Sequence, residues 1–283
     1  MGTIILLGAG QMGQAAYRLV NRAHYTVTAF ADNNPALWGG TLCGCPILSV
    51  EDAAARAPDG FLIAVAGRDR TEALRAQLRA LGYAGEVRAL SEYMEALDIR
   101  GAVLSLLAER MEHLPGAVAE LGVYRGDFAA LLSRAFPRRT LYLFDTFEGF
   151  DPRDVGAEAE KGYSRAAEGA FADTSVDAVL SKLAAPENAV VRKGYFPETA
   201  AGLDPDLRFC LVSLDADLYT PTLSGLRWFY PRLAPGGVLL VHDYWNARFS
   251  GVRAAVEAFE AERGRLLVLP VGDLHGSVMV VRT

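Results

Sequence analysis

The chain has 283 residues, of which 51% are hydrophobic and 22% are charged, as is typical of soluble globular proteins. This length predicts one large domain or two modest ones, with enough apolar surface for a core that needs no disulfide bonds. Lys and Arg total 28 against 34 Asp and Glu, giving a net charge of −6 without any long basic run. This balance argues against binding to the phosphate backbone of nucleic acids.

No segment of the sequence predicts secretion or membrane insertion. The opening residues MGTIILLGAG lack the basic region and cleavage site of a signal peptide. No apolar run approaches the roughly 20 residues that a membrane span needs. The three cysteines, Cys43, Cys45 and Cys210, are too few for a disulfide framework. We therefore expect a cytoplasmic protein with reduced thiols and with neither a membrane nor a nucleic acid as a partner.

The first strand, expected at residues 3–7, runs into a glycine loop. The loop GAGQMG matches G-x-G-x-x-G between a strand and a helix, the context of a nucleotide-binding loop, with its glycines at Gly8, Gly10 and Gly13. The next strand, expected at 27–31, ends at Asp32, whose carboxylate can accept hydrogen bonds from both hydroxyls of a ribose. The remaining elements expected in this half are a helix, a strand, a helix and a strand at residues 14–22, 61–66, 70–81 and 86–90.

A second strand–glycine–helix start begins at Gly116. The strand leads through Glu120, Gly122 and Gly126 into a helix expected at 127–136. The strand after that helix ends at Asp145, which follows Gly126 at the spacing by which Asp32 follows Gly13. Later strands are expected at 189–192, 209–214, 237–241, 266–271 and 277–282. Later helices are expected at 176–183, 222–230 and 252–263.

Alternating strands and helices predict an α/β protein with two Rossmann-like domains in tandem. We expect a small domain at residues 1–95, a helical linker at 96–115 and a larger domain at 116–283. The last two strands are joined by the short segment 272–276, which suits a hairpin. The hairpin would leave an antiparallel strand at one edge of the second sheet.

The second glycine loop carries an acid in the pattern Glu120-x-Gly122-x-x-x-Gly126. Close to a helix N-terminus, an acid would repel the pyrophosphate of a dinucleotide. It would suit a ligand that bears an ammonium group, such as S-adenosylmethionine.

Four further motifs follow in order, and together with the loop they resemble the macrocin O-methyltransferase (TylF-type) family. They are FDTFEGF at 144–150, LDADLY at 214–219, YPRLAPGG at 230–237 and His242-Asp243-Tyr244. The resemblance covers about residues 99–283. It implies a class I methyltransferase fold, S-adenosylmethionine as methyl donor and a divalent metal, typically Mg²⁺.

Ligands of open α/β sheets bind outside the carboxyl ends of the strands, where the motif residues fall. Asp145 is expected to hold the ribose hydroxyls, and Glu120 is expected to face the methionine end. The backbone can approach the donor closely at Gly122 and Gly126. The other residues expected near the donor are Gly194, Tyr195 and Asp215.

Asp215, His242 and Asp243 are the expected metal ligands, at the ends of adjacent strands. A metal there would bind two vicinal hydroxyls of the acceptor and acidify the one to be methylated. Asp217 is the first choice of general base. The family usually has an aspartate where this chain has His242, and imidazole favours transition metals over Mg²⁺. His242 is therefore a ligand, the base itself or a spectator, and Asp215 and Asp217 have the alternative of capping the next helix.

Other polar residues point to chemistry less strongly. His24, His113 and His275 lie away from the motif ends and are expected in surface or packing positions. The polar stretch 151–172 has no clear periodicity, and we expect it to be a loop that closes over the acceptor.

The sequence predicts an S-adenosylmethionine-dependent O-methyltransferase, assisted by a divalent metal, that methylates a hydroxyl of a sugar or glycosylated small molecule. For the first half, a nucleotide or nucleotide-sugar site, an NAD(P) site and a ligand-free docking or dimerisation domain stay open. The rival functions are an NAD(P)-dependent sugar oxidoreductase and a non-catalytic S-adenosylmethionine-binding protein. A homo-oligomer also stays open.

Overall fold

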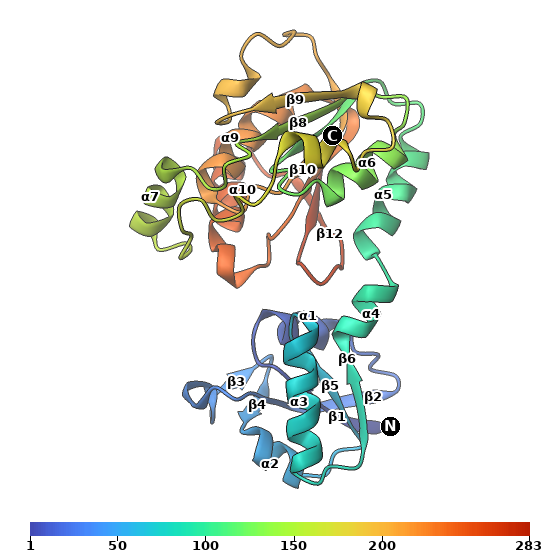
Figure 1. The fold of residues 1–283 in the computed structure, drawn as a ribbon, viewed down its shortest axis with the longest axis vertical. Helices are drawn as coiled ribbons and strands as arrows, with labels where there is room; N and C mark the ends of the chain where they lie inside the picture. The colour runs from blue at the N-terminus through green and yellow to red at the C-terminus, as the bar shows by residue number, and fades with distance from the viewer. The chain divides into compact units, whose positions relative to one another are not determined.

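The computed structural model describes residues 1–283 (Figure 1), and its contacts divide the chain into two compact units, Met1–Asp98 and Ile99–Thr283. Each unit is built around one β-sheet with helices on both faces. None of the helices is both long enough and apolar enough to cross a membrane.

The first unit has a six-stranded sheet in the order β3-β4-β2-β1-β5-β6, in which β3 alone is antiparallel to its neighbour. Its strands are β1 (Gly2–Leu7), β2 (Tyr25–Ala31), β3 (Thr41–Leu42), β4 (Cys45–Leu48), β5 (Gly60–Ile63) and β6 (Glu86–Ala89). Its helices are α1 (Gln11–Leu19), α2 (Val50–Ala55), α3 (Arg68–Ala80) and α4 (Leu90–Ala96). Tyr17 of α1 packs into the apolar cluster on one face, and Val50 of α2 and Leu78 of α3 pack on the other. The elements β3, β4 and α2 are additions to those expected.

The second unit has a seven-stranded sheet in the order β12-β13-β11-β10-β7-β8-β9. Its strands are β7 (Ala117–Leu121), β8 (Leu141–Asp145), β9 (Ala189–Lys193), β10 (Phe209–Leu214), β11 (Leu233–Val241), β12 (Leu267–Pro270) and β13 (Val278–Val281). Its helices are α5 (Ile99–Arg110), α6 (Asp127–Ala135), α7 (Pro152–Lys161), α8 (Val176–Leu180), α9 (Tyr219–Phe229) and α10 (Ser250–Arg263). Side chains of α9 and α10 fill the core on one face, and those of α5, α6 and α8 fill it on the other.

The expected antiparallel edge strand is wrong in its position. β12 and β13 do form a hairpin, but the antiparallel strand β13 inserts beside β11, and β12 takes the edge. The reason is burial: Val278 and Val280 of β13 are 1% and 0% exposed, whereas Leu267 and Leu269 of β12 are 45% and 40% exposed. The more buried strand therefore takes the inner place.

Four parallel strands of the second unit end at the same level. Leu121 at the end of β7 is paired with Phe144 of β8 and with Leu214 of β10, and Leu214 is paired with Val241 of β11. The ladder continues for one more residue in each case. The residues that follow the strand ends donate the additional backbone bonds: Gly122, Asp215 and His242, with N···O distances of 2.8–2.9 Å. The register of the sheet thus places the residues just after these ends side by side. They lie next to the topological switch point of the sheet, which falls between β7 and β10.

Gly122 is required by this convergence. Its φ is +85°, and a Cβ at this position would lie 2.1 Å from the carbonyl oxygen of Asp215. A side chain would therefore combine an unfavourable backbone conformation with a clash against backbone that cannot move without disturbing the register.

Replacing Gly122 with alanine is expected to lower the free energy of unfolding by about 2–4 kcal/mol. Urea denaturation of the two proteins measures the difference. Gly156→Ala is the matched control, because Gly156 lies in the exposed part of α7 and a Cβ there has no neighbour within 4 Å. The control should be neutral or stabilising by up to about 1 kcal/mol. Equal stability of the two variants would contradict the close approach of β7 and β10.

Candidate functional site

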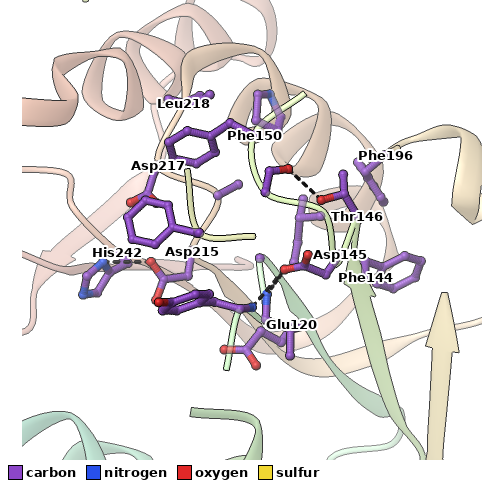
Figure 2. A pocket seen from close by; sticks show the side chains of 18 of the residues that line it. Glu120, Phe144, Asp145, Thr146, Phe150, Phe196, Asp215, Asp217, Leu218 and His242 are labelled. Carbon is purple, nitrogen blue, oxygen red and sulfur yellow. Dashed lines mark hydrogen bonds and ion pairs between the residues drawn. The ribbon is translucent and has the colours of Figure 1, made fainter. Parts of the chain in front are cut away.

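A pocket of about 380 Å³ opens at the carboxyl ends of β7, β8, β9, β10 and β11 (Figure 2). Nine of the residues expected to form the site line it: Glu120, Gly122, Asp145, Gly194, Tyr195, Asp215, Asp217, His242 and Asp243. Gly126 does not line it. It is the N-cap of α6 with φ +76°, and a Cβ there would lie 2.8 Å from a methyl group of Val179. Gly126 therefore acts on helix packing in this structure.

Asp145 organises the glycine loop. One carboxylate oxygen accepts the backbone N–H groups of Val123 and Tyr124 at 2.6 and 2.9 Å, and the other accepts that of Phe147 at 2.6 Å. These bonds fix the loop after β7 to the end of β8. The same carboxylate lies in the pocket, where its remaining lone pairs are directed by a rigid backbone.

The carboxylate of Glu120 is buried, and one of its oxygens lacks a hydrogen-bond partner. The residue is 1% exposed, and its Oε2 has no hydrogen-bond partner in the chain. Burial and the nearby charge of Asp215 raise the pKa of Glu120 well above its usual value, and the cation of Arg100 opposes this rise. A ligand that donates hydrogen bonds and carries positive charge would satisfy the unpaired oxygen.

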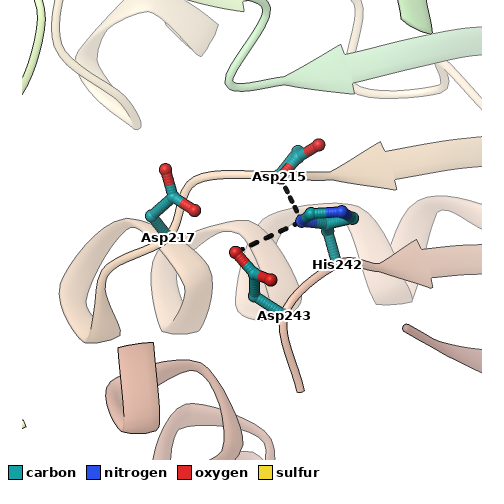
Figure 3. A group of neighbouring side chains, drawn as sticks. All are labelled: Asp215, Asp217, His242 and Asp243. Carbon is teal, nitrogen blue, oxygen red and sulfur yellow. Dashed lines mark ion pairs between the residues drawn. The ribbon is translucent and has the colours of Figure 1, made fainter. Parts of the chain in front are cut away.

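Asp215, Asp217, His242 and Asp243 form a compact polar cluster (Figure 3), in which one ligand atom from each residue lies within 4.8 Å of the others. Nδ1 of His242 lies 2.8 Å from Oδ1 of Asp215 and 3.3 Å from Oδ2 of Asp243. Asp217 and Asp243 have φ values of +59° and +57°, a left-handed conformation that aspartate tolerates better than most residues. Three carboxylates and one imidazole thus meet at the ends of β10 and β11.

The charges of this cluster depend on each other. Burial alone lowers the pKa of His242, but the carboxylates of Asp215 and Asp243 outweigh burial and raise it to about 10. Burial opposes ionisation of Asp215, yet the charge of His242 brings its pKa down to about 2. Burial and the charge of Asp215 raise the pKa of Asp217 well above its usual value. Together these shifts favour a cationic imidazole between the carboxylates of Asp215 and Asp243, and they disfavour a further negative charge on Asp217.

Two neighbours of this cluster were not among the expected site residues. Arg100, near the start of α5, lines the pocket and places Nη2 at 3.4 Å from Oδ2 of Asp215. His275 was expected to lie away from the motif ends, and this expectation is wrong, because its ring centroid lies 5.1 Å from that of His242. The hairpin between β12 and β13 carries His275 back to the sheet, a placement that local sequence does not encode. Arg100 lies in the segment 96–115, for which the sequence predicts only a helical linker.

The stretch 151–172, expected to be a loop, contains helix α7, which begins at Asp151 as N-cap and Pro152 at its first position. The helix carries two buried acids. Asp154 accepts a hydrogen bond from the hydroxyl of Tyr195 at 2.9 Å, and Glu158 accepts one from the backbone N–H of Tyr219 at 2.6 Å. Burial raises the pKa of Asp154 to about 6. Asp151, Asp154 and Phe171 of this stretch line the pocket.

Asp154→Asn is expected to become more stable relative to the unmodified protein as the pH rises from about 4 to 7. In this window the folded protein binds the proton of Asp154 more tightly than the unfolded chain does, so ionisation of the carboxyl group destabilises the fold. The gain should reach roughly 1–3 kcal/mol at neutral pH and vanish near pH 4, as measured by urea unfolding across the range.

Asp151→Asn is the control with the opposite sign. Arg153 lowers the pKa of Asp151, so this variant should lose stability at neutral pH and regain parity in acid. A difference for Asp154→Asn that does not change with pH would show that Asp154 has an ordinary pKa.

The glycine loop of the first unit is tightly packed. Gly8 has φ +119°, and a Cβ on Gly13 would lie 1.9 Å from the carbonyl oxygen of Gly8, whereas Gly10 faces open space. Asp32 accepts the backbone N–H of Ala9 at 2.8 Å, as Asp145 does for the second loop. The structure brings the four predicted residues together. A pocket of about 190 Å³ in this unit lies elsewhere, near the strand starts at Tyr25, Gly60 and Glu86.

Two curated relatives align with the second unit. An 8-demethyl-8-(2,3-dimethoxy-alpha-L-rhamnosyl)-tetracenomycin-C 4'-O-methyltransferase of Streptomyces olivaceus is 29% identical in an alignment 176 residues long, which covers 58% of this chain and 64% of the relative. A mycinamicin III 3''-O-methyltransferase of Micromonospora griseorubida is 31% identical in an alignment 143 residues long, which covers 46% of this chain and 56% of the relative. The chain thus spans less than two thirds of the length of each of these relatives.

Two solved structures have a similar fold. The calicheamicin methyltransferase CalS11 superposes with a TM-score of 0.56 at 19% identity, over 75% of this chain and 85% of that one. The O-methyltransferase NovP superposes with a TM-score of 0.52 at 21% identity, over 65% of this chain and 80% of that one.

Residues 99–275 match the family described as Macrocin-O-methyltransferase (TylF), and the match contains the strand ends, the acidic cluster and the pocket. The chain belongs to the macrocin O-methyltransferase (TylF) family.

Proposed function

We propose that the protein is an S-adenosylmethionine-dependent O-methyltransferase that methylates a hydroxyl of a sugar or a glycosylated small molecule. The observation that carries this proposal is the buried carboxylate of Glu120, whose Oε2 has no hydrogen-bond partner. It lies in a pocket at the topological switch point of the sheet, between β7 and β10. Membership of the family and the names of the sugar-modifying relatives support the reaction class and the acceptor class.

The residues of the pocket suit the parts of the donor. S-adenosylmethionine supplies a methyl group on a cationic sulfonium centre. Oε2 of Glu120 is placed to accept hydrogen bonds from the ammonium group. Asp145 is placed to accept hydrogen bonds from the ribose hydroxyls. Gly194 and Tyr195 follow β9, where the adenine of the donor would lie. The loop from Gly122 keeps the backbone close to the ligand.

The cluster at the ends of β10 and β11 fits a divalent cation. Asp215, Asp243 and the neutral imidazole of His242 would hold it, since their ligand atoms converge within 4.8 Å. Carboxylates suit Mg²⁺, and the imidazole shifts the preference toward transition metals. When bound, such an ion would make an acceptor hydroxyl more acidic. Asp215 also lines the donor pocket, so it would lie between the methyl donor and the divalent cation.

Asp217 is the proposed general base. It lies two residues after Asp215 at the same strand end and lines the pocket, so its carboxylate form can take the hydroxyl proton while the oxygen attacks the methyl carbon and the bond from that carbon to sulfur breaks. The raised pKa of Asp217 makes this carboxylate a stronger proton acceptor once it is ionised. The cationic state of His242 between two carboxylates makes His242 a weaker candidate for the base in this arrangement. Alignment of the two reactants supplies much of the rate in such a transfer.

The first unit is proposed to be a small Rossmann-type domain that binds a nucleotide or nucleotide-sugar through Gly8, Gly10, Gly13 and Asp32. An NAD(P) site and a ligand-free docking domain are the alternatives for this unit. A fluorescence titration with NADH tests the NAD(P) alternative, because the proposed methyl transfer does not use NADH.

Isothermal titration with S-adenosylhomocysteine should show one site per chain in the second unit. Glu120→Gln is expected to weaken binding about 10–100-fold, because it removes the charge that pairs with the ammonium group. Glu112→Gln is the control, since the side chain of Glu112 is 63% exposed at the surface. No binding by the unmodified protein would overturn the proposed function.

Asp217→Asn is expected to lower kcat by about 100-fold or more while changing the Kd for S-adenosylhomocysteine by less than about threefold. Asp206→Asn, at an exposed position of the same unit, should leave both values unchanged. An unchanged kcat for Asp217→Asn would assign the base to another residue without affecting the donor site.

Chelation by EDTA and the variants Asp215→Ala and Asp243→Ala test the metal. Each is expected to reduce turnover by about 100-fold or more, and calorimetry should show loss of divalent-ion binding in both variants. Full activity of both variants, together with resistance to EDTA, would remove the metal from the proposal.

A further inference from the structure

Asp154, on helix α7, lines the donor pocket and has no role in the methyl transfer described above. Its position follows from the strand order. Glu120 lies on β7, Asp145 ends β8, and Gly194 and Tyr195 follow β9, so three consecutive strands carry these residues. Neighbouring strands lie about 4.8 Å apart, so a donor held at Glu120 and Asp145 extends its base toward the end of β9. Tyr195 bonds Asp154 at this end of the pocket.

Three carboxylates line this side of the pocket, and only one of them has an oxygen that accepts no hydrogen bond from the chain. Both oxygens of Asp145 accept backbone N–H groups. Both oxygens of Asp151 are bonded by the guanidinium of Arg153, at 2.8 and 2.9 Å. Oδ1 of Asp154 accepts the hydroxyl of Tyr195, and its Oδ2 has no partner in the chain.

The surroundings of Asp154 suit a flat base with a hydrogen-bond donor. Asp154 is 5% exposed, and the aromatic rings of Tyr195 and Phe196 line the same part of the pocket. The nearby cation of Arg153 is engaged elsewhere: it pairs with Asp151 and Glu198 and lies 3.6 Å from the ring centroid of Tyr195. Oδ2 of Asp154 is thus an acceptor in the pocket that the chain leaves available, and burial of the side chain raises the pKa of its carboxyl group.

We propose that Asp154 selects the base of the methyl donor, by accepting a hydrogen bond from the exocyclic amino group of adenine through Oδ2. This proposal rests on the proposed function. Asp154 is a specificity-determining residue in this account: a 6-amino purine satisfies its free oxygen, whereas a 6-oxo purine presents a second acceptor and is rejected.

The test compares two ligands in calorimetric titrations, S-adenosylhomocysteine and S-inosylhomocysteine, which differ in the group at position 6 of the purine. The unmodified protein should bind the 6-oxo compound about 10–100-fold more weakly. Asp154→Asn presents an amide and Asp154→Leu presents no acceptor, so in both variants the ratio of the two Kd values should fall below about threefold.

Asp151→Asn is the matched control. It changes a carboxylate of the same pocket whose oxygens Arg153 already occupies, and asparagine remains a good N-cap for α7. This variant should keep the full preference for the adenine ligand.

The outcomes distinguish a failure of the role of Asp154 from a failure of the proposed donor site. If the unmodified protein binds S-adenosylhomocysteine without preference over the 6-oxo compound, the role of Asp154 is wrong while the donor site stands. A preference that survives in Asp154→Asn and Asp154→Leu would also overturn it. If neither compound binds, the proposed function fails together with this inference.

Discussion

The common ending of four parallel strands is the constraint on which the second unit depends. The pairing of Leu121 with Phe144 and Leu214, and of Leu214 with Val241, places the next residue of each strand on one line. The backbone hydrogen bonds of the sheet continue through Gly122, Asp215 and His242. These residues are therefore held by the sheet and do not belong to a mobile loop. A shift of any one strand by one residue would turn its site side chain to the opposite face.

The site concentrates negative charge that the fold must accommodate. Glu120, Asp215, Asp217 and Asp243 are drawn together by the sheet, and Arg100 and His242 supply the nearest positive charge. Burial of the two carboxyl groups and repulsion by the charge of Asp215 raise the pKa values of Glu120 and Asp217. Cationic ligands would relieve both effects, which is the electrostatic reason that a sulfonium donor and a divalent ion suit this pocket. The net charge of −6 is thus in part a local property of one pocket.

Residues at strand ends could be predicted because parallel strands, glycine loops and their spacing leave a clear pattern in the sequence. Glu120, Asp145, Asp215 and His242 were found in this way, and the structure brings them together. Arg100 and His275 could not be found, because α5 and the β12–β13 hairpin reach the site only through tertiary packing. The position of β13 inside the sheet depends on relative burial, which a hairpin signal does not reveal. Helix α7 was missed because its buried side chains include Asp154 and Glu158, so its inward face lacks an apolar period.

A crystal structure of the protein with S-adenosylhomocysteine tests the central claim most directly. We expect the ligand to lie across the ends of β7, β8 and β9, with its ammonium group at Glu120, its ribose at Asp145 and its adenine beside Tyr195. A ligand bound in the glycine loop of the first unit, or a pocket at these strand ends that stays empty at saturating ligand, would contradict it.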